Sequence, residues 1–175
     1  MITLHSIAVR VYYEDTDAGG IVYYSNYLKF FERARTDWLR EVGVSHRDMS
    51  EVEGLNLVVR DCAVQYLRPA RLDDLLSIEV GLADPATDIG RASLRFTQRA
   101  LLTARESDAG DGIGTAAVAS PGSARRAGAP EILATGSVRV ACMDRRTGRP
   151  VALPQRVMSR ISALVGSQSS GQFPG

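Results

Sequence analysis

Residues 11–40 read VYYEDTDAGGIVYYSNYLKFFERARTDWLR, and this stretch holds the pattern that decides the fold. From about Ser25 to Glu41 apolar side chains recur at spacings of three and four, which predicts an amphipathic helix. Gly43 lies just beyond and is a typical C-terminal stop. The apolar face consists of Tyr27, Phe30, Phe31, Ala34, Trp38 and Leu39. A face of this size needs a second apolar surface to cover it.

Most of the remaining chain shows the two-residue alternation that is typical of β-strands. Apolar residues occupy every second position in five segments, at about residues 7–13, 62–67, 76–82, 92–97 and 136–142. Short links and strict alternation favour an antiparallel sheet with one covered face. A short helical piece is expected at 45–52, and an amphipathic helix after Pro154. The sequence therefore predicts an α+β fold in which one curved sheet wraps around the long helix.

The length of 175 residues suits one domain, which we expect to span residues 1–165. Residues 107–129 lie between two strand patterns and are rich in Gly, Ala and Ser, which predicts a flexible insertion. The segment 166–175 is rich in Ser, Gly and Gln, and we expect a disordered tail there.

Composition excludes several classes of protein. The chain carries 21 basic and 20 acidic residues, without the basic excess of a nucleic-acid-binding protein. No apolar run is long enough to span a bilayer, and the first ten residues lack the pattern of a signal peptide, so a cytoplasmic location is expected. Cys62 and Cys142 are expected to be buried, reduced thiols. Neither they nor His5 and His46 have metal-ligand spacing, so no metal site is predicted.

The segment from Glu14 to Tyr27 joins a strand, a turn with adjacent glycines and a helix N-terminus. Free first-turn N–H groups and the helix dipole attract negative charge, such as the charge that an acyl transfer develops on the carbonyl oxygen. A carboxylate just upstream could act on the carbonyl carbon or on a water molecule. The same residue types are also ordinary turn and capping residues. Spacing alone does not decide whether Asp15 and Asp17 are a paired acid and base or a solvated turn.

Residues 11–40 resemble the signature of the 4-hydroxybenzoyl-CoA thioesterase family, and most closely its Tol–Pal-associated, YbgC-like acyl-CoA thioesterases. The likeness continues in ARLDDLLSI at 70–78 and FTQR at 96–99, and covers nearly the whole chain apart from 107–129 and the tail. The resemblance implies a hotdog fold, hydrolysis of an acyl-CoA and no cofactor or metal. It also implies a homodimer, often paired into a tetramer, with sites at the subunit interface. An unpaired edge strand in an open sheet points to an oligomer as well.

The resemblance also assigns roles to single residues. The second aspartate of the D-T-D-A-G-G run, Asp17, corresponds to the catalytic carboxylate, acting as base or nucleophile. The oxyanion donor corresponds to the backbone N–H of Tyr24, where close relatives usually have histidine. Glu32 and Asn26 are expected to be supporting residues, and for Glu32 a surface or interface salt bridge is the equally weighted alternative. The aromatic side chains of the helix either line an acyl pocket or form the core, and core is favoured. Candidates for contacts with CoA phosphates are the arginines at 68, 71, 91, 95, 99 and 145.

Two alternatives to a general acyl-CoA thioesterase remain. The substrate could be an aromatic acyl-CoA, such as hydroxybenzoyl- or hydroxynaphthoyl-CoA. The protein could instead be a non-catalytic module that binds acyl carrier protein or an envelope complex, although the intact Asp17 motif speaks against pure binding. A hotdog dehydratase is disfavoured because neither histidine lies in the Asp17–Tyr24 segment.

Overall fold

The computed structural model describes residues 1–104 and 130–169. The insertion predicted at 107–129 and the last residues of the predicted tail lie outside the described residues.

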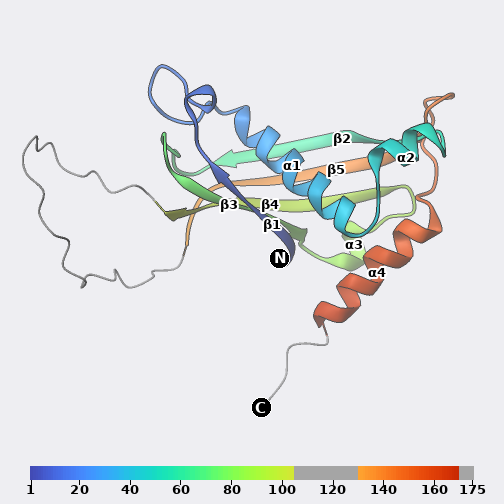
Figure 1. Ribbon diagram of the computed structural model, residues 1–175. Coiled ribbons are helices and arrows are strands. Elements are labelled where there is room, and N and C mark those ends of the chain that lie inside the picture. Colours follow the sequence, from blue (N-terminus) through green and yellow to red (C-terminus); the bar gives the residue numbers. More distant parts are fainter. Residues whose placement is uncertain (105–129, 170–175) are drawn as a thin grey trace, which may run out of the picture.

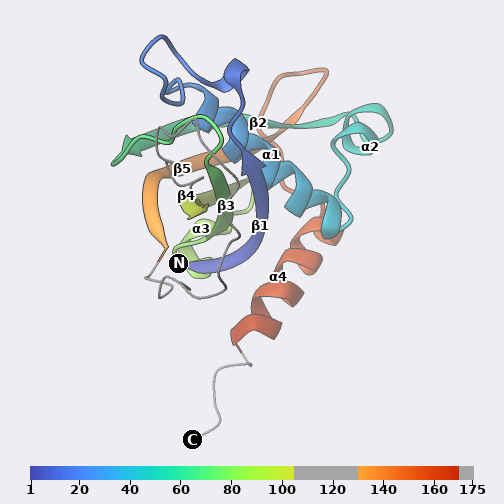
Figure 2. The same cartoon turned by 60° about the vertical axis from the view of Figure 1, so that its left-hand side comes forward.

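The described residues form one five-stranded antiparallel sheet that curves around a long helix (Figures 1 and 2). The strands are β1 (Ile2–Arg10), β2 (Leu55–Tyr66), β3 (Leu75–Leu82), β4 (Ser93–Ala104) and β5 (Glu131–Asp144). The helical elements are η1 (Tyr13–Asp15), α1 (Asn26–Glu41), α2 (His46–Glu51), α3 (Pro85–Asp88) and α4 (Gln155–Ser169). The strand order is β1-β3-β4-β5-β2, so β1 and β2 form the two edges. This architecture confirms the predicted α+β hotdog fold.

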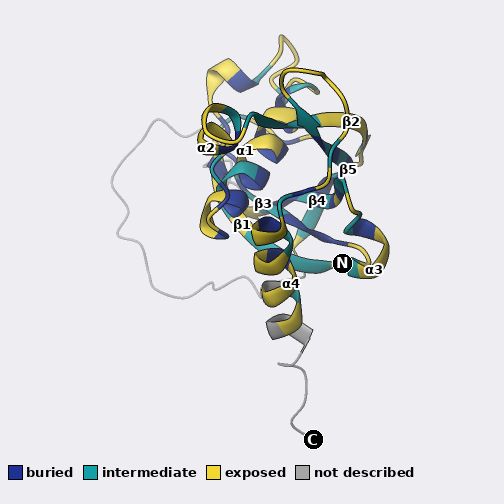
Figure 3. Ribbon diagram, turned by 90° about the vertical axis from the view of Figure 1, so that its right-hand side faces the viewer, coloured by how far each residue is buried: buried dark blue, intermediate teal, exposed yellow. Residues whose placement is uncertain are grey.

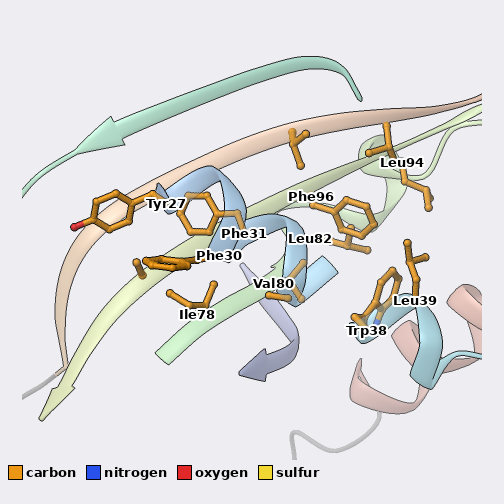
Figure 4. Close-up of a cluster of buried hydrophobic side chains, with 14 of the residues drawn as sticks. Tyr27, Phe30, Phe31, Trp38, Leu39, Ile78, Val80, Leu82, Leu94 and Phe96 are labelled. Carbon is orange, nitrogen blue, oxygen red and sulfur yellow. The ribbon is translucent and has the colours of Figure 1, made fainter. Parts of the chain in front are cut away.

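The apolar face of α1 forms the centre of the core. Figure 4 shows its aromatic side chains pointing at apolar residues of β3 and β4, and Figure 3 shows that the opposite side of the helix is exposed. Phe30 is fully buried, and the rings of Trp38 and Phe96 meet edge to face with centroids 5.4 Å apart. Burying one such side chain contributes about 1.5–3 kcal/mol, so this face alone is a large share of the stability. The aromatic residues of α1 are therefore core, as favoured from the sequence, and Tyr27 and Phe31 also line hollows at its surface.

The end of α1 is closed in the way that Gly43 predicts. Gly43 has φ +72°, and the N–H of Val44 donates to the carbonyl of Leu39 at 2.7 Å, which completes a Schellman motif. Arg160 of α4 donates to the carbonyl of Val42 at 2.8 Å, and its guanidinium occupies the space that a Cβ at position 43 would need. The C-terminal helix therefore caps the first long helix.

The edge strand β2 differs from the prediction of one covered face. Residues of β3 and β4 alternate between buried and less buried positions, but none of the twelve residues of β2 is buried. The reason is the position of α1, which lies over the part of the sheet formed by β1, β3 and β4 and contacts these strands. Consequently Val59 is 56% exposed, and the prediction that both cysteines are buried is right for Cys142 but wrong for Cys62.

Several boundaries also differ from the sequence-based expectation. β2 begins at Leu55, well before the alternation at 62–67, because a register shift between Val59 and Asp61 interrupts the pattern. α4 continues to Ser169, so 166–169 are helical rather than part of a disordered tail. Adding a residue to a formed helix costs little, which explains how weak helix formers extend it. Among the described helices, none is long and apolar enough to cross a membrane.

Gly136 of β5 generates a prediction about this packing. A Cβ at this position would lie 2.8 Å from the Cε2 atom of Phe31, well inside normal contact. Gly136→Ala should therefore lower the free energy of unfolding by about 1–3 kcal/mol, measured by denaturant titration at fixed protein concentration. Because a smaller side chain at position 31 relieves the overlap, the double variant with Phe31→Leu should lose less than the two single losses combined. Strict additivity would contradict this account.

Candidate active site

Asp17 lies in a tight hairpin between η1 and α1. The hairpin is closed by hydrogen bonds from the Asp17 N–H to the carbonyl of Ile21, at 2.9 Å, and from the Gly20 N–H to the carbonyl of Asp17, at 3.0 Å. Gly20 has φ +70°, a conformation that favours glycine. The adjacent glycines of the motif thus allow the tight turn, and this turn leaves the Asp17 side chain exposed at the surface.

One oxygen of the Asp17 carboxylate is held and the other is available. The Gly19 N–H donates to Oδ1 at 2.7 Å, and a Cβ at position 19 would lie only 3.0 Å from the same oxygen. Within the described part of the chain, Oδ2 has no hydrogen-bond partner. The turn therefore orients the carboxylate and leaves one oxygen free to accept a proton or attack a carbon atom.

The N-terminus of α1 presents a free donor beside this loop. The carbonyl of Tyr23 accepts from the N–H of Asn26 at 2.9 Å, whereas the N–H of Tyr24 has no acceptor among the residues that the structure describes. Ser25 is the N-cap, but its side chain makes no capping hydrogen bond. Unsatisfied N–H groups at a helix start carry the positive end of the helix dipole, which suits a developing oxyanion.

Asp15 and Asn26 lock the loop onto the helix. Asp15 is buried, and its Oδ2 accepts from the N–H of Tyr12 at 3.0 Å. Its carbonyl accepts from Asn26 Nδ2 at 2.9 Å and from the Tyr23 N–H at 2.8 Å. The carboxylate of Asp15 thus accepts a hydrogen bond from the backbone of its own turn, while the side chain of Asp17 is exposed. The Asn26 side chain therefore contacts the backbone of Asp15 and not the Asp17 carboxylate.

Asp17 and Tyr24 line the same hollow, of about 440 Å³. We call it the tyrosine pocket, after the lining residues Asp17, Tyr23, Tyr24, Tyr27, Tyr66 and Arg68. The side-chain hydrogen bond with Tyr24 is the main cause that raises the pKa of Tyr23, and Asp17 adds to the effect. Burial raises the pKa of Tyr27 as well. These phenols are therefore neutral at physiological pH and supply hydroxyl groups rather than charge.

Glu32 lies in a different hollow. It lines a groove of about 480 Å³ between α1 and β2, which we call the edge groove and which also includes Leu28, Phe31, Arg35, Val59 and Cys62. The Oε1 atom of Glu32 accepts from Thr36 Oγ1 at 2.7 Å on the same helix. In this chain the structure therefore brings Asp17 and Tyr24 together but does not bring Glu32 to them.

Of the six candidate arginines, only Arg68 lines the tyrosine pocket. Arg68 also pairs with Glu131 at 2.7 Å, and Arg99 binds Glu79 through Nε at 3.0 Å. Arg145 reaches the carbonyl of Ser50 at 3.5 Å. Arg68 is thus the member of the set that shares a pocket with Asp17.

Comparison with known proteins decides the family. The family model of the thioesterase-like superfamily matches residues 11–161. The chain belongs to this superfamily. A curated relative, the acyl-CoA thioesterase YbgC of Haemophilus influenzae, is 36% identical over 159 residues, which cover 91% of this chain and 95% of the relative. The acyl-CoA thioester hydrolase YbgC of Escherichia coli O157:H7 is also 36% identical, over 91% of this chain and 96% of its own.

Solved structures agree on the fold of this thioesterase-like protein. A probable thioesterase from Bartonella henselae superposes with a TM-score of 0.64 at 29% identity, covering 86% of this chain and 98% of its own. A 1,4-dihydroxy-2-naphthoyl-CoA thioesterase from Synechocystis superposes with a TM-score of 0.65 at 20% identity, covering 92% and 97%. At that identity the second likeness concerns the fold alone.

One polar feature of this thioesterase-like protein was missed from the sequence. Arg35 is buried and donates through Nη1 to Gln98 Oε1 at 2.7 Å, and Gln98 Nε2 donates to the carbonyl of Phe31 at 2.8 Å. Burial lowers the pKa of Arg35. A signal existed, because Gln98 occupies the inward position that follows Leu94 and Phe96 in the alternation of β4. A polar residue in that register indicates a buried partner.

The role of Asn26 as a lock leads to a test with its neighbour as control. Asn26→Ala removes the hydrogen bond to the Asp15 carbonyl and should lower the free energy of unfolding by about 1 kcal/mol. Ser25→Ala, which removes an N-cap side chain that makes no capping hydrogen bond, should change it much less. Chemical denaturation of both variants measures the difference. Equal losses would show that the link between Asn26 and Asp15 contributes nothing specific.

Proposed function

We propose that this protein hydrolyses the thioester of an acyl-CoA to a free acid and CoA, with Asp17 as the catalytic carboxylate and the Tyr24 N–H as oxyanion donor. The observation that carries the proposal is that both groups line one pocket at the N-terminus of α1. Superfamily membership and the YbgC relatives, matched over nearly their whole length, support the reaction type.

The chemistry follows from this geometry. The thioester carbonyl points its oxygen at the Tyr24 N–H, which stabilises the negative charge that develops there. The free Oδ2 of Asp17 either removes a proton from an attacking water molecule or attacks the carbonyl carbon itself. In both routes the C–S bond breaks, CoA leaves as the thiol after gaining a proton, and one water molecule is consumed. The hydrogen bond from the Gly19 N–H keeps the carboxylate in place during these steps.

A second candidate function is supported by the walls of the pocket. Aromatic rings prefer edge-to-face and offset contacts with other rings, and the ring of Tyr66 lies within contact distance of the rings of both Tyr24 and Tyr27. An aromatic acyl group therefore suits the pocket as well as an aliphatic one. Turnover of matched aliphatic and aromatic acyl-CoAs, followed by release of the thiol, separates these candidates. Absence of turnover with every thioester, on CoA or on acyl carrier protein, would favour a binding module.

We also propose that the protein works in the cytoplasm as a homodimer joined along β2. The two cysteines are unpaired, as expected where thiols are kept reduced. β2 is a long edge strand with exposed apolar side chains, and the apolar edge groove runs beside it. Natural proteins pair or cover such an edge. A second copy of this chain would pair with the edge strand and would also cover its exposed apolar side chains. A tetramer would require a further surface that these residues do not define.

Asp17 is expected to be essential for turnover but not for folding. Asp17→Asn keeps the size of the side chain and removes its charge, so kcat should fall by about 10²–10⁴-fold or more while the melting temperature stays close to that of the wild type. The control is Glu14→Gln, which removes an exposed carboxylate three residues away and should leave kcat unchanged. Near-normal turnover by the Asp17 variant would refute the assignment.

The dimer proposal is tested with two exposed valines. Val59→Lys places a charge on β2 beside the edge groove and should shift the protein toward a monomer in light scattering at micromolar concentration. Val52→Lys introduces the same charge at a more exposed position after α2 and should leave the mass unchanged. A wild-type protein that is monomeric and fully active at this concentration would overturn the proposal.

A further inference from the structure

Tyr66 makes a contact with the proposed oxyanion residue that neither the motif nor the comparisons assign. Tyr66 is the last residue of β2, and its hydroxyl donates to the backbone carbonyl of Tyr24 at 3.1 Å. The two residues are 42 positions apart in the chain. The bond therefore ties the sheet edge to the segment that precedes α1.

The position of this bond matters because of peptide geometry. The N–H of Tyr24 belongs to the planar peptide unit whose carbonyl, that of Tyr23, accepts from the Asn26 N–H at 2.9 Å. The carbonyl of Tyr24 belongs to the next peptide unit, and Tyr66 holds it. Each of the two planes that meet at the Tyr24 Cα atom is thus fixed by one hydrogen bond. Loss of either bond frees one of the two dihedral angles at Tyr24.

The surroundings make Tyr66 a firm support. Its ring lies 5.7 Å from that of Tyr27 and 6.3 Å from that of Tyr24, centroid to centroid. Tyr27 is itself anchored, because it is buried and its hydroxyl accepts from the Ala70 N–H at 3.2 Å. Burial is the main cause that raises the pKa of Tyr66, so its phenol remains a donor throughout the neutral range.

We infer that Tyr66 is a positioning residue for catalysis: its hydroxyl fixes the peptide plane that carries the Tyr24 carbonyl, and so limits the rotation at the Tyr24 Cα atom that would turn the Tyr24 N–H away from the developing oxyanion. This inference rests on the proposed function. A donor stabilises a transition state best when its orientation is set before the reaction. The Tyr66 hydroxyl also satisfies the Tyr24 carbonyl, whose negative dipole would otherwise lie unpaired beside the tyrosine pocket and oppose the oxyanion.

A positioning role predicts that loss of the Tyr66 hydroxyl lowers kcat and leaves substrate binding unchanged. In Tyr66→Phe the ring contacts remain and only the hydrogen bond is lost, so kcat should fall about tenfold, less than the 10²–10³-fold typical of removing an oxyanion donor itself. Binding of a non-hydrolysable thioether analogue of the substrate, measured by calorimetry, should be unchanged, because the donor acts on charge that the ground state lacks. Tyr13→Phe removes an exposed phenol outside the pocket and should leave both quantities unchanged.

A rescue variant separates the hydroxyl from the ring. Replacing Tyr66 by 4-aminophenylalanine restores a donor at the same place and should recover most of the lost rate. Weaker binding of the analogue with unchanged kcat would make Tyr66 a substrate contact and overturn the inference. Unchanged kinetics of Tyr66→Phe would overturn it too, while the loss of turnover in Asp17→Asn still supports the proposed function. If the wild type hydrolyses no thioester, the proposed function itself fails, and the inference fails with it.

Discussion

The apolar face of α1 can be buried only by a surface that curves around it, and the rest of the structure depends on this constraint. Phe30 and Trp38 reach into β3 and β4, and this contact fixes the axis of the helix. Once the helix axis is fixed, the position of the helix N-terminus relative to the sheet is fixed as well. The hairpin that carries Asp17 is then tied to that N-terminus through Asp15 and Asn26. A need for burial thus determines where a carboxylate and a backbone N–H lie.

The parts of the fold that the sequence predicted are those governed by local rules. The spacing of Tyr27, Phe30 and Trp38 set the extent and the buried face of α1, and Gly43 marked its end, because helix period and helix stop depend on neighbouring residues. Exposure of β2 depends instead on how far α1 covers the sheet, a property of the whole packing. Alternation therefore placed Cys62 on a strand correctly but could not show that its side chain stays exposed.

In the candidate site, too, local sequence predicted some features and only the three-dimensional packing shows the others. Asp17 and the Tyr24 N–H were assigned through a motif that is continuous in sequence, and the structure places both at one pocket. Spacing left the relation of Asp15 to Asp17 open, because it does not show which backbone groups a carboxylate meets. The structure directs the Asp15 side chain to the N–H of Tyr12. The contact from Tyr66 joins the end of β2 to a residue 42 positions earlier in the chain, so no local pattern could have indicated it.

The strand order has a consequence for the chain while it is being made. β2 pairs with β5 and with no other strand of the described sheet, although β5 begins at Glu131, far beyond the end of β2 at Tyr66. A ribosome adds roughly 5–20 residues per second, so β2 waits for several seconds with both of its edges open. Its apolar side chains and unpaired amides are exposed to the cell during this time. The strand that carries Tyr66 is thus the second to be synthesised, but it can pair only after β5, the last strand of the described sheet, has been made.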